Sequence, residues 1–123
     1  MAFHARELVG RYRLVVSDEL LSFVERAFIE PAPPAERARI RAEALAEARQ
    51  AELEITPDGT VISRAGPDEF YRVALDLPDT LVDEVTFEKA PGLGVRLRKL
   101  SDHTLVALQA GKPDAVFERA PDA

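Results

Sequence analysis

The sequence predicts a mainly β domain with an α-helical insertion: an antiparallel up-and-down barrel of about eight strands, with two helices between strands 1 and 2. Apolar and polar residues alternate with a period of two in short segments from residue 51 onward, as in half-buried strands. Short turns rich in Gly, Pro and Asp join these segments, so neighbouring strands must be antiparallel. Between residues 17 and 50 the apolar spacing is helical instead.

The first strand is expected over residues 8–16. Tyr12 and Leu14 fall on one face of this segment, and Arg11 and Arg13 fall on the other. Such alternation is typical of a strand with one buried face.

A helical cap is expected over residues 17–50. Ser17 offers a hydroxyl N-cap, with Asp18 following it in the first turn. The first helix carries one apolar stripe, with Phe23 beside it, made of Leu20, Leu21, Val24, Ala27 and Phe28. Pro31 and Pro33 end this helix, since proline cannot continue one.

The second helix is expected over residues 35–50, which are rich in Ala, Glu and Arg. These are strong helix formers. Only Ile40 and Leu45 are large and apolar there, so we expect this helix to lie on the surface.

Seven more strands complete the predicted sheet. Pro57-Asp58-Gly59 is a hairpin turn in which proline presets φ and glycine takes a positive φ. A twisted meander of this length removes its exposed edges by closing into a barrel. The expected strands are 51–56, 60–64, 70–77, 81–89, 95–100, 104–109 and 115–119.

The composition describes a single domain spanning residues 1–123. Hydrophobic residues make up 46% of the chain, which suffices for one core at this length. The absence of cysteine excludes disulfides, thiolate metal sites and cysteine nucleophiles. A net charge of −6 repels phosphate groups, so we expect no nucleic-acid partner.

We expect a cytoplasmic, bacterial-type protein with no membrane span. No segment approaches the ~18 apolar residues of a spanning helix. Residues 1–9 include Arg6 and Glu7 and lack the apolar stretch of a signal peptide. Arginines far outnumber the lysines, which are Lys89, Lys99 and Lys112.

Two short motifs flank the predicted barrel. Gly10-Arg11-Tyr12 stands in the first strand and Phe117-Glu118-Arg119 in the last. With the helical pair after the first strand, they resemble the calycins, the superfamily of lipocalin-like and fatty-acid-binding-protein-like barrels. The resemblance implies that Arg119 packs over Tyr12 to close the barrel and that the interior holds a small apolar or amphipathic ligand. The Arg-x-Tyr carboxylate clamp of fatty-acid-binding proteins is absent, so their ligand site is not carried over.

Strand parity selects the residues expected to face the interior. Tyr71 lies on the same face as Val73 and Leu75, so its hydroxyl should point into the barrel or its mouth. Arginines on the opposite faces, Arg72, Arg96 and Arg98, are expected to face solvent. The predicted ligand-binding residues are Tyr71, Phe87, Leu97 and Phe117, with Leu21, Val24 and Phe28 as the cap.

The favoured function is therefore a small binding protein without cofactor or metal. One alternative is a non-catalytic interaction protein in which Phe23, Val24, Ala27 and Phe28 form a homodimer contact.

A second alternative is an enzyme on a curved-sheet scaffold resembling the ketosteroid-isomerase-like cone, with Asp76 or Asp83 as its base. His4 and His103 are far apart in the sequence and show no metal-ligand spacing. No nucleophile stands with the Asp102-His103 pair, so we expect no catalytic residue there.

Overall fold

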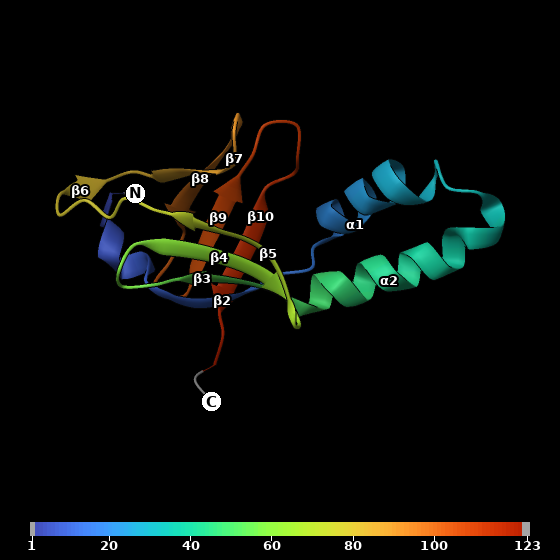
Figure 1. Ribbon diagram of the computed structural model, residues 1–123, viewed down its shortest axis with the longest axis horizontal. Helices are drawn as coiled ribbons and strands as arrows, with labels where there is room; N and C mark the ends of the chain where they lie inside the picture. The colour runs from blue at the N-terminus through green and yellow to red at the C-terminus, as the bar shows by residue number, and fades with distance from the viewer. Residues whose placement is uncertain (1, 122–123) are drawn as a thin grey trace.

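The computed structural model describes residues 2–121 and confirms the predicted fold class: one antiparallel sheet curls into an up-and-down barrel (Figure 1). Its eight strands follow the order β5-β4-β3-β2-β10-β9-β8-β7, in which the first barrel strand pairs with both β3 and the last strand. The strands are β2 (Gly10–Leu14), β3 (Ala51–Ile55), β4 (Thr60–Ala65), β5 (Asp68–Ala74), β7 (Val85–Ala90), β8 (Leu93–Lys99), β9 (Thr104–Leu108) and β10 (Ala115–Arg119).

The barrel is nearly closed. Strands β5 and β7 stand at the two ends of the strand order and lie in contact, but no backbone ladder joins them. Side chains span this seam instead, since the rings of Tyr71 and Phe87 lie 6.0 Å apart. The closure expected from the sequence is therefore completed partly by side-chain packing.

A small second sheet, which the sequence does not predict, lies beside the barrel. Strand β1 (Phe3–His4) pairs with β6 (Leu81–Val82) in antiparallel fashion. The expected strand 81–89 is therefore divided, with β6 ending before Asp83 and β7 beginning at Val85. This pairing with the N-terminal segment takes Leu81 and Val82 out of the barrel.

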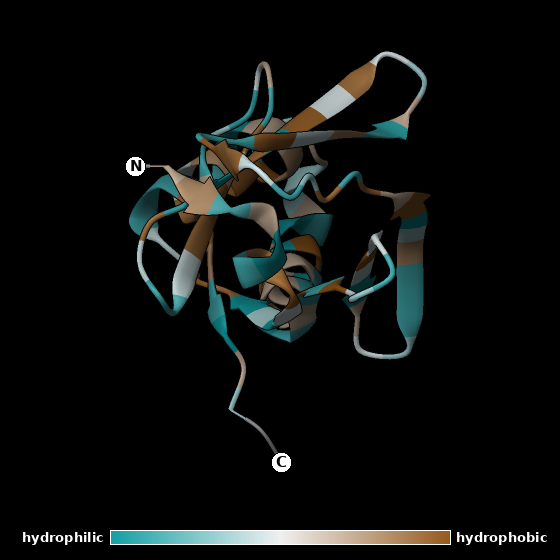
Figure 2. Cartoon of the chain, turned by 90° about the vertical axis from the view of Figure 1, so that its left-hand side faces the viewer, coloured by the Kyte–Doolittle hydropathy of each residue, from teal (hydrophilic) through white to brown (hydrophobic). Residues whose placement is uncertain are grey.

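The faces of the barrel strands are those that the alternation predicts. Tyr12 on β2 and Leu97 on β8 are at most 2% exposed. Seen from one end of the barrel in Figure 2, hydrophobic and hydrophilic bands alternate along the strands. The arginines that alternate with the buried residues are exposed, and they are Arg11, Arg13, Arg72, Arg96 and Arg98.

One end of the barrel is sealed by the chain that precedes β2. Phe3 and Leu8 are buried in the same core cluster as the inner strand residues. Leu8 belongs to a 3₁₀ turn, η1 (Ala5–Leu8), and not to the first strand as expected from the sequence. Its carbonyl accepts a hydrogen bond from the buried Tyr12 hydroxyl at 2.7 Å, which holds the turn against the strand.

Arg119 completes this closed end. Its guanidinium carbon lies 5.1 Å from the centroid of the Tyr12 ring. The guanidinium also donates to the carbonyls of Glu7 at 2.6 Å, Val9 at 3.0 Å and Asp102 at 3.0 Å. One side chain of the last strand therefore ties together the N-terminal turn and the turn before β9.

Gly10 gives Arg119 the room that it needs. The φ of Gly10 is 150°, and a Cβ at this position would collide with a terminal nitrogen of the Arg119 guanidinium. Only glycine adopts this φ without strain and also leaves space for the Arg119 guanidinium.

The two helices extend away from the barrel, side by side (Figure 1). The first, α1 (Asp18–Val24), continues as a π-helical turn, η2 (Glu25–Ile29), and Ser17 caps it by accepting from the Leu20 amide at 3.2 Å. After a 3₁₀ turn, η3 (Pro34–Glu36), the second helix, α2 (Arg37–Gln50), returns to the sheet. The helices thus leave and re-enter the barrel at the end opposite Arg119.

We predict that Gly10→Ala lowers the free energy of unfolding by about 2–3 kcal/mol, because it adds backbone strain and displaces the Arg119 guanidinium. Equilibrium urea unfolding measures this. Gly92→Ala is the matched control, since Gly92 has a φ of 79° but open space around it, and it should cost only about 1 kcal/mol. Equal losses in the two variants would contradict the role given to the Arg119 contact.

Candidate functional site

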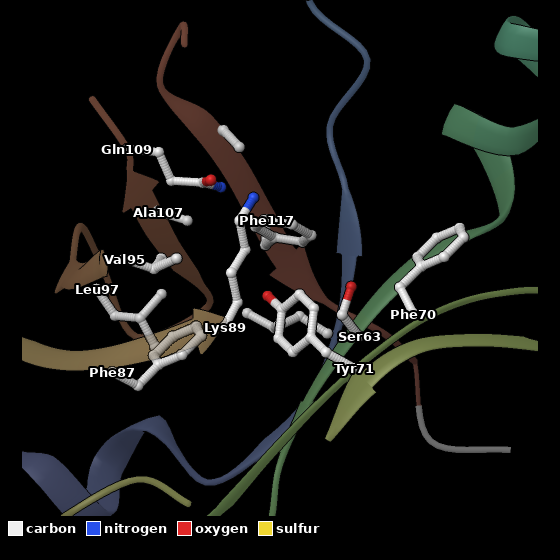
Figure 3. A pocket seen from close by; sticks show the side chains of 12 residues that line it. Ser63, Phe70, Tyr71, Phe87, Lys89, Val95, Leu97, Ala107, Gln109 and Phe117 are labelled. Atoms are coloured by element: carbon white, nitrogen blue, oxygen red, sulfur yellow. The ribbon is translucent and has the colours of Figure 1, made fainter. Parts of the chain in front are cut away.

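A cavity of about 300 Å³ lies inside the open half of the barrel (Figure 3). Seven of the eight barrel strands, all except β2, supply its walls or, for Gln109, the residue just after the strand. The walls are mainly apolar, and the lining residues are Leu53, Ser63, Phe70, Tyr71, Phe87, Lys89, Val95, Leu97, Ala107, Gln109, Ala115 and Phe117.

The structure brings all four sequence-predicted ligand residues to this cavity. Leu97 and Phe87 form its buried part, with exposures of 0% and 6%. Tyr71 and Phe117 are half-buried and pack against the core from the side of the cavity. Strand parity alone was sufficient to find these residues, because every second side chain of a barrel strand faces inward.

Phe70 also borders the cavity, although the sequence does not single it out. It precedes Tyr71 on β5 and is 54% exposed. In Figure 3 its ring points away from the other lining side chains, toward the helical end of the molecule. It also lines the groove beside the helices, so Phe70 marks the rim between the cavity and that groove.

Among residues 2–121, Lys89 is the one charged residue in the wall, and it is not among the residues predicted from the sequence. It follows Val85 and Phe87 at the same parity on β7, at the point where the register with β8 shifts. Its ammonium reaches into the cavity in Figure 3. The parity that places Phe87 inward also applies to Lys89.

Lys89 lies in an environment that disfavours its charge. Burial among apolar side chains lowers the pKa of Lys89, and the neighbouring ammonium of Lys112 lowers it further. Among residues 2–121, no acidic residue lines the cavity. This part of the chain therefore presents a cation in the wall without a carboxylate beside it.

Three neutral polar groups share the wall with Lys89: the Ser63 hydroxyl, the Tyr71 phenol and the Gln109 amide. Ser63 and Tyr71 are directly opposite in the β4–β5 ladder. Burial raises the pKa of Tyr71, and the Ser63 hydroxyl offsets part of that rise. Tyr71 thus stays a neutral hydrogen-bond donor at physiological pH.

The other inward-facing lysine, Lys99, is in a different situation. It sits at the closed end on β8, where its ammonium lies 2.8 Å from Glu7 Oε1 and 3.4 Å from Asp102 Oδ1. The hydrogen bond to Glu7 raises the pKa of Lys99. Carboxylates therefore balance the charge of Lys99 at the closed end, whereas no acidic residue among residues 2–121 lines the wall beside Lys89 at the open end.

The residues expected to cap the barrel form a separate surface. Leu21, Val24 and Phe28 line grooves along the packed helices, and Leu21 and Phe28 are 41% and 57% exposed. Phe23 packs edge-on against Phe28, with ring centroids 6.3 Å apart. None of these residues is among those that line the barrel cavity.

The residues considered for catalysis are not gathered at any site. Asp76, Asp83, His4 and His103 are exposed, and none of them lines the cavity. Within residues 2–121, no group of three or more His, Cys, Asp or Glu side chains is placed to hold a metal ion. In the same part of the chain, no helix is both long and apolar enough to cross a membrane.

Comparisons with protein families and with curated proteins find no relative of this chain. The chain matches no protein-family model, and no curated protein is significantly similar to it. We therefore infer the function from the geometry of the cavity.

We predict that Lys89→Met stabilises the protein by about 0.5–1 kcal/mol at pH 7, because it removes a partly buried charge that lacks a counter-ion. The folded-state pKa of Lys89 lies below its usual 10.5, so the unfolded chain binds the proton more tightly. The contribution of Lys89 to the free energy of unfolding of wild type should therefore rise with pH between its folded-state pKa and 10.5. The difference in stability between Lys89→Met and wild type should shrink over the same pH range.

Urea unfolding of both proteins from pH 7 to pH 10.5 measures this difference. Arg96→Met, on the exposed outer face of β8, is the control, and its stability difference from wild type should not follow this window. A Lys89→Met variant that is less stable than wild type at pH 7 would show that Lys89 is satisfied within the fold.

Proposed function

We propose that this protein is a small binding protein whose barrel holds one ligand with an apolar body. The single observation that carries the proposal is the cavity of about 300 Å³ inside the barrel. Arg119, Tyr12 and the N-terminal turn seal one end of the barrel. A ligand would enter at the other end, where the helices leave the sheet.

The chemistry of the wall supports an apolar ligand oriented by a few polar groups. The rings of Tyr71, Phe87 and Phe117 supply broad apolar surface, and the polar atoms come from four residues only. Apolar walls with a small number of placed polar groups are the usual composition of ligand sites. The volume is at the small end of the range of about 300–1,000 Å³ for such sites, which suits a single ring or a short chain.

We propose further that the barrel is calycin-like and that the protein binds without catalysing a reaction. The lock between Tyr12 and Arg119 and the place of the helices in the chain support the first point. The second point is supported by the cavity lining, in which residues 2–121 place neither a carboxylate nor an imidazole that would act as a general base.

A homodimer through the helices is the second candidate. It is favoured by the exposure of Leu21 and Phe28, whose apolar surface is uncovered in the single chain. Light scattering after size exclusion tests it. A dimer that Phe28→Ser dissociates would support this function, whereas a monomer at all concentrations would contradict it.

We predict that Ala115→Phe abolishes the binding of a neutral apolar fluorescent dye, because Ala115 lines the cavity and the added ring fills it. Wild type should bind one dye per chain, measured by fluorescence titration. The matched control is Ala74→Phe, the same change at an exposed position on the outer face of β5, which should leave dye affinity within about twofold. Dye binding that survives in Ala115→Phe would place the dye outside the barrel and contradict the proposed function.

A further inference from the structure

We propose that the ligand of the barrel is a carboxylate, whose anionic head is bound by Lys89 at the open end. This inference rests on the proposed function, because it names the chemical class of the molecule in the same cavity. It is carried by the placement of the charges around the cavity.

The first step concerns charge balance at the cavity wall. The chain as a whole carries a net charge of −6, yet among residues 2–121 the wall has one cation and no acid. An ammonium among apolar side chains is unfavourable unless an opposite charge accompanies it. A bound anion would supply that opposite charge to Lys89.

The second step is the contrast between the two inward-facing lysines. Lys99 at the closed end is paired with Glu7 and Asp102. Within the described residues, carboxylates accompany Lys99, whereas none lines the wall beside Lys89. We infer that the partner of Lys89 is the ligand.

The third step concerns the shape of the head group. Ser63, Tyr71 and Gln109 can each donate a hydrogen bond from the cavity wall. A carboxylate accepts several hydrogen bonds through its two oxygens, so it can engage Lys89 and one of these neutral donors together. An alcohol or an amine would leave the charge of Lys89 unbalanced.

The fourth step places the body of the ligand. Lys89 is near the end of β7, whereas Phe87, Val95 and Leu97 lie deeper and are at most 6% exposed. An apolar tail attached to the carboxylate would therefore point toward the closed end. The small volume favours a short chain or one ring over a long chain.

The test is displacement of the neutral dye by 4-phenylbutanoate and by 4-phenylbutan-1-ol at pH 7. These probes share a carbon skeleton and differ in the charge of the head. Wild type should bind the acid at least about tenfold more tightly than the alcohol, the size expected of a charge-assisted hydrogen bond. Lys89→Met should remove this preference and leave alcohol binding nearly unchanged.

Arg96→Met removes the same charge from the outer face of the barrel and serves as the matched control, in which the preference should persist. Equal displacement by acid and alcohol in wild type would overturn the carboxylate inference while leaving the proposed function intact. A preference unchanged in Lys89→Met would also overturn it. If the dye does not bind to wild type, the proposed function fails together with the inference. If the dye binds and neither probe displaces it, only the carboxylate inference is overturned.

Discussion

The guanidinium of Arg119 organises the closed end of the barrel, and the rest of the structure depends on it. It lies over the Tyr12 ring and donates to three backbone carbonyls in two separate turns. A planar group with five donors can make all of these contacts at once, which a lysine cannot. Gly10 leaves space for it, so the Gly-x-Tyr spacing and the basic residue of the last strand form one physical unit.

Because this end is sealed, the barrel has one closed end and one open end. The apolar plug formed by Phe3 and Leu8 and the ion pairs of Lys99 complete the closed half. The open half keeps a cavity, a seam spanned by Tyr71 and Phe87, and Lys89, beside which no acidic residue of the described chain, residues 2–121, lines the wall. The contacts that seal the barrel and the cavity therefore lie in different halves of one fold.

Alternation along the strands was enough to predict the barrel and the inward placement of Tyr71, Phe87, Leu97 and Phe117, because a period of two fixes which face is buried. It did not reveal the turn at Leu8, since a single 3₁₀ turn has no periodicity of its own. Lys89 was not predicted to face the interior, although it has the same parity as Phe87 on β7.

The direction in which the helices extend from the barrel could not be predicted from the sequence either. The second helix has a weak apolar face, with Ile40 and Leu45 as its only large apolar residues, so the sequence does not specify what it packs against. We propose the barrel cavity, and not the helical groove, as the site of binding. Intermolecular NOEs between 4-phenylbutanoate and the isotope-labelled protein test this most directly. We expect NOEs from the ligand ring to Phe87, Leu97 and Phe117, and NOEs to Leu21 and Phe28 in their place would contradict the proposal.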